Sequence, residues 1–96
     1  MIDLPDVAER VLTAVDKLSG AEVTTYGDLA AVVGTGPRQV GGILREYGAL
    51  TEWWRVVRSD GRGHDAARAS EFWDAAGIGH RDGRVDLKTH RVEWGE

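Results

Sequence analysis

Apolar residues at the start of the chain recur with the spacing of one helix face: Val7, Val11, Leu12, Val15 and Leu18. Residues at this spacing form a single stripe, so the pattern predicts an amphipathic helix. Asp3 or Asp6 is a suitable N-cap for it. The Ser-Gly pair at residues 19–20 is a suitable end.

A second, shorter helix is predicted over residues 26–33, after an extended stretch at residues 22–24. Thr25, with Asp28 three residues later, has the form of a capping box at the helix start. Gly34 is a suitable C-terminal stop, because glycine readily adopts the left-handed conformation that ends many helices.

A third helix is predicted from Pro37 to about Tyr47, after a Gly-Thr-Gly loop at residues 34–36. Proline is favoured at the first position of a helix. The apolar residues that would face the interior are Val40, Ile43 and Leu44. Two short helices joined by a short turn that contains glycine form the helix-turn-helix pattern, so residues 26–47 predict a motif that often binds DNA.

The third helix would project polar side chains outward: Arg38, Gln39 and Arg45. Arginine and glutamine are side chains that recognise bases or enter the base stack. Helix corners also occur without any role in DNA binding, so this pattern does not decide the function by itself.

Two adjacent glycines, Gly41 and Gly42, interrupt the same helix. Each costs about 1 kcal/mol of helix propensity relative to alanine. A helix that carries both is expected to need a close approach, either of a packed helix or of a DNA backbone. Tight packing explains one glycine as well as DNA does, but the second points to a different face and favours DNA.

An apolar run follows at residues 53–58, Trp-Trp-Arg-Val-Val-Arg, and predicts an extended segment. The turn Ser59-Asp60-Gly61 ends it.

A last helix is predicted from an N-cap at Asp65 through Ala76, with Gly77 as its stop. The residues expected to face the core are Phe72, Trp73 and Ala76. The tail at residues 84–94 favours a short strand pair or an ordered coil, and its apolar residues indicate docking on the body.

Length and composition fit one small domain that spans residues 1–96, mainly α-helical with short extended segments. The chain is 42% hydrophobic and 29% charged, as in ordinary soluble globular proteins. No run approaches the roughly 18 apolar residues of a membrane span, and the acidic, amphipathic N-terminus does not resemble a secretory signal. We therefore expect a cytoplasmic protein that does not contact a membrane.

The chain contains no cysteine, which excludes disulfides, thiolate metal sites and a thiol nucleophile. Its three histidines, at positions 64, 80 and 90, lie farther apart than typical metal-ligand pairs. We expect them to be solvated or to pack, and we expect no metal and no cofactor.

A net charge of -4 argues at first against nucleic acid as a partner, because neutralisation of phosphates supplies much of the affinity for DNA. The charge is unevenly distributed. Residues 34–68 carry six basic and four acidic side chains, whereas residues 1–33 carry two and six, and residues 69–96 carry four and six. One basic face on an acidic body is compatible with DNA binding.

Four segments together resemble the DNA-binding domain of the O6-alkylguanine-DNA alkyltransferases. They are Thr25-Tyr26-Gly27-Asp28-Leu29-Ala30, Pro37-Arg38-Gln39-Val40-Gly41-Gly42-Ile43-Leu44, Glu52-Trp53-Trp54-Arg55-Val56-Val57 with Asp60-Gly61, and Gly83-Arg84-Val85-Asp86-Leu87 with Trp94. The third segment occupies the place of the family's P-C-H-R-V active-site motif. Tryptophan in place of the cysteine is typical of the alkyltransferase-like members, so the chain resembles that subgroup from about residue 5 to residue 94.

The resemblance implies a helix-turn-helix or winged-helix-like fold that binds double-stranded DNA through the minor groove and flips a nucleotide. Tyr26 would press on a phosphate, and Arg38 would fill the vacated space in the stack. Gly41 and Gly42 would permit a close approach of the backbone. The other expected DNA contacts are Thr25, Gln39, Arg45 and Ser59.

The resemblance further implies a non-enzymatic protein, since alkyl transfer in the family needs the cysteine that Trp53 replaces. Such a protein would recognise O6-alkylguanine and flag it for nucleotide excision repair; we expect it to act as a monomer. The pocket for the alkylated base is expected to be lined by Trp53, Trp54, Val57 and Arg62.

Three features depart from the family pattern. Glu52 replaces the proline of the motif and Trp54 its histidine, and the loop at residues 62–68 differs, with Arg62 and Arg68 both candidates to contact the base.

If both Trp53 and Trp54 belong to the core, the pocket is closed and the chain is a DNA-binding protein or regulator without lesion preference. The acidic charge leaves a protein-interaction module as another alternative. Arg55 is expected to brace the fold, for example through an ion pair with Glu93.

Overall fold

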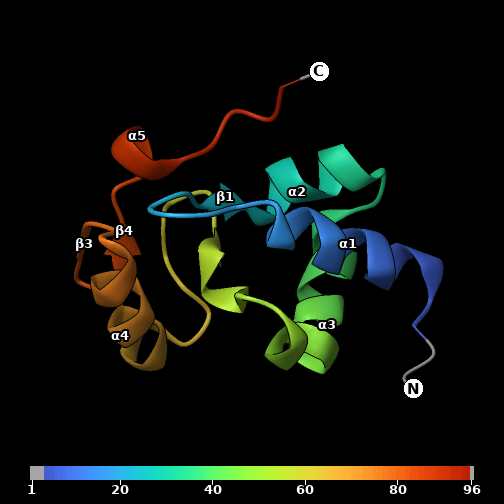
Figure 1. The fold of residues 1–96 in the computed structure, drawn as a ribbon, viewed down its shortest axis with the longest axis horizontal. Coiled ribbons are helices and arrows are strands. Elements are labelled where there is room, and N and C mark those ends of the chain that lie inside the picture. Colours follow the sequence, from blue (N-terminus) through green and yellow to red (C-terminus); the bar gives the residue numbers. More distant parts are fainter. Residues whose placement is uncertain (1–3, 96) are drawn as a thin grey trace.

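The computed structural model describes residues 4–95 as a mainly α-helical chain with two very short strand pairs (Figure 1). The helices are α1 (Asp6–Asp16), α2 (Tyr26–Val33), α3 (Pro37–Tyr47), α4 (Ala66–Ala76) and α5 (Leu87–His90), with 3-10 turns η1 (Gly48–Leu50) and η2 (Trp53–Arg55). The strands are β1 (Thr24–Thr25), β2 (Val56–Val57), β3 (His80–Arg81) and β4 (Arg84–Val85). The predicted fold class is confirmed.

Helices α2 and α3 form the predicted helix-turn-helix. The Thr25 hydroxyl accepts a hydrogen bond from the backbone N–H of Asp28 at 3.1 Å and caps α2. Gly34 ends α2 in the left-handed conformation, with φ of 79°. Pro37 begins α3. Because these signals are local, both helices begin and end where the sequence predicts.

The parallel pair β1–β2 lies between two hydrophobic cores. Val56 pairs with Thr24 and Val57 with Thr25. Successive side chains of a strand point to opposite sides, and the two valines accordingly enter different cores. The first core joins α1, α2 and α3 around Val56, and the second joins β2 to α4 and the β3–β4 hairpin around Val57.

The second core is built around Trp73 of α4, which is fully buried. Its indole Nε1 donates a hydrogen bond to the backbone carbonyl of Trp54 at 2.8 Å. A Cβ placed on Gly63 would lie 2.7 Å from the Trp73 ring, so the loop before α4 requires glycine at this position. These contacts fix the loop and the start of α4 relative to η2.

Several local expectations are wrong. Residues 53–55 form a 3-10 turn, and only Val56–Val57 is extended. Phe72 is 39% exposed and lies outside the core. Pro5, whose ring has no side-chain acceptor, is the N-cap of α1, so Asp6 lies in the first turn and caps nothing; Asp3 lies outside the described residues. Helix α1 also ends at Asp16, before the predicted stop.

The C-terminal segment docks on the body, as its apolar residues predict, but it is neither a strand pair among its own residues nor a coil throughout. Arg84–Val85 pairs with His80–Arg81 in an antiparallel hairpin, and residues 87–90 form α5. Beyond α5, the Val92 N–H donates to the carbonyl of Val23, and the Trp94 indole donates to the Thr24 hydroxyl at 2.9 Å. Among residues 4–95, no helix has the length and apolar character needed to cross a membrane.

Candidate nucleic-acid interface

The outward face of α3 is a stripe of two arginines with two glycines between them: Arg38, Gly41, Gly42 and Arg45. This spacing of three, four and seven residues places the four on one side of the helix, so the expectation that the second glycine points to a different face is wrong. Both arginines are exposed, whereas Val40 and Leu44 are buried on the opposite side. A Cβ placed on either glycine would meet no atom within 4 Å. Packing against the protein therefore explains neither glycine, and the stripe is open to the approach of another molecule.

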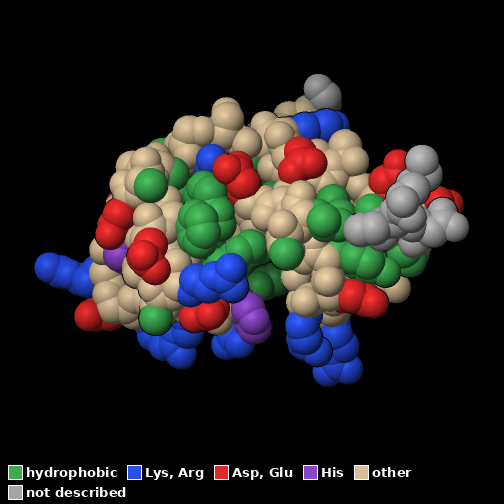
Figure 2. Space-filling view, turned by 60° about the horizontal axis from the view of Figure 1, so that its bottom comes forward, with side chains coloured by type: hydrophobic (Ala, Val, Ile, Leu, Met, Phe, Trp, Pro, Cys, Tyr) green, Lys and Arg blue, Asp and Glu red, His purple; other side chains and the backbone are tan. Residues whose placement is uncertain are grey.

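Basic side chains gather beside this stripe. Figure 2, which brings the lower side of Figure 1 forward, shows Lys and Arg side chains projecting along its lower edge, with a histidine close to them. Within residues 4–95, neither Arg38 nor Arg45 forms an ion pair. The basic excess of residues 34–68 therefore includes exposed arginines of α3 that are available to an anionic partner.

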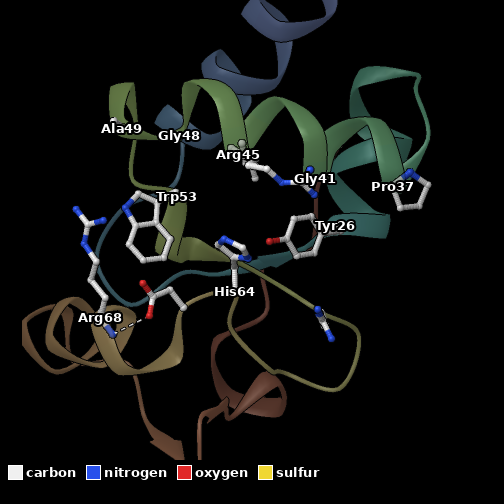
Figure 3. A pocket seen from close by; sticks show the side chains of 12 residues that line it. Tyr26, Pro37, Gly41, Arg45, Gly48, Ala49, Trp53, His64 and Arg68 are labelled. Atoms are coloured by element: carbon white, nitrogen blue, oxygen red, sulfur yellow. Dashed lines mark hydrogen bonds between the residues drawn. The ribbon is translucent and has the colours of Figure 1, made fainter.

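A cavity of about 440 Å³ lies between α3, the loop after β2 and the start of α4 (Figure 3). Its lining residues are Tyr26, Pro37, Gly41, Leu44, Arg45, Gly48, Ala49, Trp53, Arg58, His64, Asp65 and Arg68. Because Gly41 and Arg45 belong to the outward stripe of α3, the cavity opens directly beside that stripe.

Trp53 forms one wall of the cavity and is only partly buried. The Trp53 and Phe72 rings meet edge to face, with centroids 6.0 Å apart, and the Arg68 guanidinium lies over the Trp53 ring, 5.5 Å from its centroid. Gly48 lies behind it, so close that a Cβ there would be 3.3 Å from the Trp53 Cβ. An aromatic wall next to a cation is a suitable surface for a planar base.

Tyr26 lines the other end of the cavity, and in Figure 3 its hydroxyl points toward His64. Burial raises the pKa of the phenol above its ordinary value, while the nearby charges of Arg58 and Arg45 act in the opposite direction. The phenol is therefore neutral at neutral pH and can donate a hydrogen bond. This end of the cavity combines a phenol donor with basic side chains.

Three residues that the sequence places in the pocket do not line it: Trp54, Val57 and Arg62. Trp54 and Val57 are buried in the second core, where Trp54 stacks on Phe72 with centroids 5.6 Å apart. Arg62 is exposed outside the cavity, and Arg68 of α4 lies over Trp53 instead. The adjacent tryptophans have different places, one in the core and one at the cavity, so the closed-pocket alternative, which requires both in the core, is wrong.

The remaining predicted DNA contacts differ in their accessibility. Thr25 is only 3% exposed and its hydroxyl caps α2, so little of it is accessible, and its contact with a phosphate stays a prediction. Gln39 is exposed and accepts a hydrogen bond from Thr35. Ser59 is exposed in the loop after β2, and Arg38 lies in a shallow groove with Gly42 on the outward side of α3.

Sequence reasoning missed two basic residues of the cavity, Arg58 and His64. They flank the turn at residues 59–61, where the N–H of Gly61 donates to the carbonyl of Arg58 at 2.8 Å. A turn reverses the chain and brings the residues on its two sides to the same surface. The recognised turn was therefore a signal that these side chains could line one site.

Arg55 braces the fold as expected, but its partner is Glu52 and not Glu93. The Arg55 Nε donates to the Glu52 carboxylate at 2.8 Å, and Nη1 donates to the carbonyls of Gly20 and Glu22 at 2.8 and 2.9 Å. The carboxylate of Glu52, which departs from the family motif, is thus neutralised within the fold and does not line the cavity.

Comparisons with known sequences show the family of the chain. The sequence model of the family described as 6-O-methylguanine DNA methyltransferase, DNA binding domain, matches residues 6–84. A DNA base-flipping protein of Escherichia coli (strain K12) is 35% identical over 95 residues, which cover 90% of this chain and 74% of that protein. The DNA base-flipping protein of Shigella flexneri matches with the same values.

Two solved structures share the fold. S. pombe Atl1 in complex with damaged DNA containing O6-carboxymethylguanine matches with a TM-score of 0.82 and 21% identity, covering 96% of this chain and 99% of that one. S. pombe ATL in complex with DNA matches with a TM-score of 0.77, 22% identity and the same coverage. The chain therefore belongs to the family of the 6-O-methylguanine DNA methyltransferase DNA-binding domain, as one of its alkyltransferase-like members.

Proposed function

We propose that this protein binds duplex DNA that contains an O6-alkylated guanine, and holds the flipped base in the cavity without removing its alkyl group. One observation carries the proposal: the cavity with the Trp53 wall opens beside the Arg-Gly-Gly-Arg stripe of α3. A helix that lies in a DNA groove and a pocket that receives a base must be neighbours, and here they share Gly41 and Arg45.

The cavity suits an extruded purine. Its volume of about 440 Å³ lies within the range of roughly 300–1,000 Å³ that is usual for ligand sites. Stacking of a base on an aromatic side chain contributes about 1–3 kcal/mol, and Trp53 presents such a face. Flipping costs a few kcal/mol, and insertion of the planar Arg38 guanidinium into the stack would offset part of this cost.

The proposed binding is non-enzymatic. The chain has no cysteine, so no thiolate exists to accept an alkyl group. The nitrogen of the Trp53 indole carries its lone pair in the ring and is no nucleophile at neutral pH. A protein that binds the lesion and leaves it unrepaired needs a later step, and we propose that nucleotide excision repair proteins take over from a monomeric complex.

The proposed function is tested by titration of duplexes with and without one O6-methylguanine, followed by tryptophan fluorescence. We expect tighter binding of the modified duplex and a change in emission as a base reaches Trp53. Equal affinity for both duplexes would contradict lesion recognition, and no binding at low salt would contradict DNA binding altogether. Mass spectrometry of the DNA after incubation should find the methyl group still on guanine.

Arg38→Ala tests the proposed insertion into the base stack. We expect this variant to lose most of the preference for the modified duplex, because nothing then fills the space of the flipped base. Arg81→Ala is the matched control, since Arg81 is an exposed arginine of the β3–β4 hairpin. An unchanged preference in Arg38→Ala, or an equal loss in Arg81→Ala, would contradict the role of Arg38.

A further inference from the structure

The Tyr26 end of the cavity gathers three basic side chains from separate parts of the chain: Arg45 from α3, Arg58 from the end of β2, and His64 from the loop before α4. Arg58 and Arg45 are close enough to the phenol to influence its pKa. In Figure 3 the Tyr26 hydroxyl and the His64 ring point toward one another.

Among residues 4–95, none of these side chains forms an ion pair. Across residues 4–95, the ion pairs join Arg55 to Glu52, His80 to Asp74 and Arg91 to Asp28. The side chains of Arg45, Arg58 and His64, and the hydroxyl of Tyr26, likewise form no hydrogen bond with another residue of this described part. Convergent basic groups without an acidic partner repel one another, so their arrangement favours an external anion.

We propose that Arg58 and His64 hold one backbone phosphate of the DNA against the Tyr26 hydroxyl. This inference rests on the proposed function and assigns to it two contacts, Arg58 and His64, that lie outside the outward stripe of α3. It places the phosphate at the end of the cavity opposite Trp53, so that one nucleotide could present its base to the indole and its phosphate to the basic end.

The chemistry of this end favours a phosphate over a base edge. The guanidinium groups, the imidazole and the neutral phenol can all supply donors, whereas a base edge presents donors as well as acceptors. The carboxylate among the lining residues is that of Asp65, which accepts from the N–H of Arg68 and caps α4. Charge-assisted bonds to phosphate oxygens are the stronger class of hydrogen bonds.

The first test measures the salt dependence of binding to the O6-methylguanine duplex. Loss of one phosphate contact lowers the slope of log K against log salt by about 0.9. We expect this reduction for Arg58→Ala. The matched control is Arg62→Ala, which removes the same charge from the same loop but from a residue outside the cavity. A slope unchanged in Arg58→Ala, or lowered equally in both variants, would overturn the proposal.

The second test locates the phosphate. Duplexes are prepared in which one phosphate at a time, on either side of the lesion, is replaced by a neutral methylphosphonate. We expect one position to weaken binding of the wild type by about tenfold, the effect of roughly 1.4 kcal/mol, and to leave Arg58→Ala unaffected. If the methylphosphonate weakens binding of Arg58→Ala as much as it weakens binding of the wild type at every position, Arg58 does not contact a phosphate and the proposal is overturned.

The third test asks whether His64 contacts the same phosphate as Arg58. His64→Gln removes the imidazole and keeps a side chain of similar size, and His64 is exposed, so the fold should tolerate the change. We expect His64→Gln to bind the O6-methylguanine duplex more weakly and to lose part of its response to the methylphosphonate at the position that Arg58 reads. A full wild-type response of His64→Gln at that position would overturn the role of His64.

The outcomes separate this inference from the proposed function. If the wild type shows no preference for the modified duplex, the proposed function fails. If that preference is present and Arg58→Ala and His64→Gln bind as the wild type does, only the phosphate site fails. Because Arg58 and His64 are exposed, both variants should fold, and equal melting temperatures establish this before each titration.

Discussion

Gly48 lies directly behind Trp53: a Cβ added to the glycine would be 3.3 Å from the Trp53 Cβ and 3.8 Å from its Cγ. The end of α3 thereby sets the position of the cavity wall. We predict that Gly48→Ala displaces the indole and weakens the preference for O6-methylguanine duplexes by roughly tenfold, the effect of about 1.4 kcal/mol. The shift should also appear as a change in tryptophan emission of the free protein.

A double-mutant cycle with Trp53→Ala provides the control. If Gly48→Ala acts through the indole, it should have no further effect once the indole is absent. Equal effects in both backgrounds would show that Gly48 acts elsewhere. The φ of Gly48 is -57°, which alanine adopts readily, so strain of the backbone does not enter the comparison.

Replacement of either glycine of α3 by alanine should raise the stability of the free protein and weaken DNA binding. A Cβ at Gly41 or Gly42 meets nothing within the described protein, so alanine at either position should stabilise the free fold by up to about 1 kcal/mol. The same methyl group would stand between α3 and DNA. We therefore predict that Gly41→Ala and Gly42→Ala raise the midpoint of urea unfolding and weaken DNA binding. A variant that is more stable and binds equally well would contradict a close approach of DNA to this face.

The helix-turn-helix could be predicted from the sequence because its boundaries depend on local chemistry. Thr25, Gly34 and Pro37 each act on backbone groups within four residues, and each end lies where they indicate. The β3–β4 hairpin carries a comparable signal, since the turn at residues 82–83 is Asp-Gly with φ of 53° and 77°. The hairpin was missed because its strands are two residues long, too short to show an alternation of apolar and polar residues.

The cavity could be predicted only in part. The sequence does not distinguish two adjacent tryptophans, because the exposure of Trp53 depends on η2, on Gly48 and on Phe72 of α4. The sequence also does not distinguish Arg62 from Arg68 as the arginine that lies over Trp53. The position of Arg68 depends on where α4 begins and how Trp73 anchors it, and these are tertiary relationships without a local pattern.

Arg55 should be a main source of stability. Its side chain is 5% exposed and donates to Glu52 and to two backbone carbonyls in the segment before β1. Arg55→Met keeps much of the volume and removes all three bonds, and we predict a loss of about 2–4 kcal/mol in urea unfolding. Glu52→Gln keeps a side-chain acceptor at a half-exposed position and should cost less than about 1 kcal/mol. Equal losses in the two variants would show that the ion pair, and not the carbonyl contacts, carries the effect.

The Asp28–Arg91 pair should make the docking of the C-terminal segment sensitive to acid. Arg91 donates to the Asp28 carboxylate at 2.8 and 3.0 Å, and this bonding lowers the pKa of Asp28 below its ordinary value. The stabilisation is present above the unfolded pKa of about 3.9 and is lost as the pH falls through the lower folded value. We therefore predict that the melting temperature of the wild type falls more between about pH 6 and pH 2 than that of Asp28→Asn.

The control is Asp6→Asn, which removes a carboxylate that forms no ion pair among residues 4–95 and should follow the wild type. Parallel curves for wild type and Asp28→Asn would contradict a stabilising role of the pair.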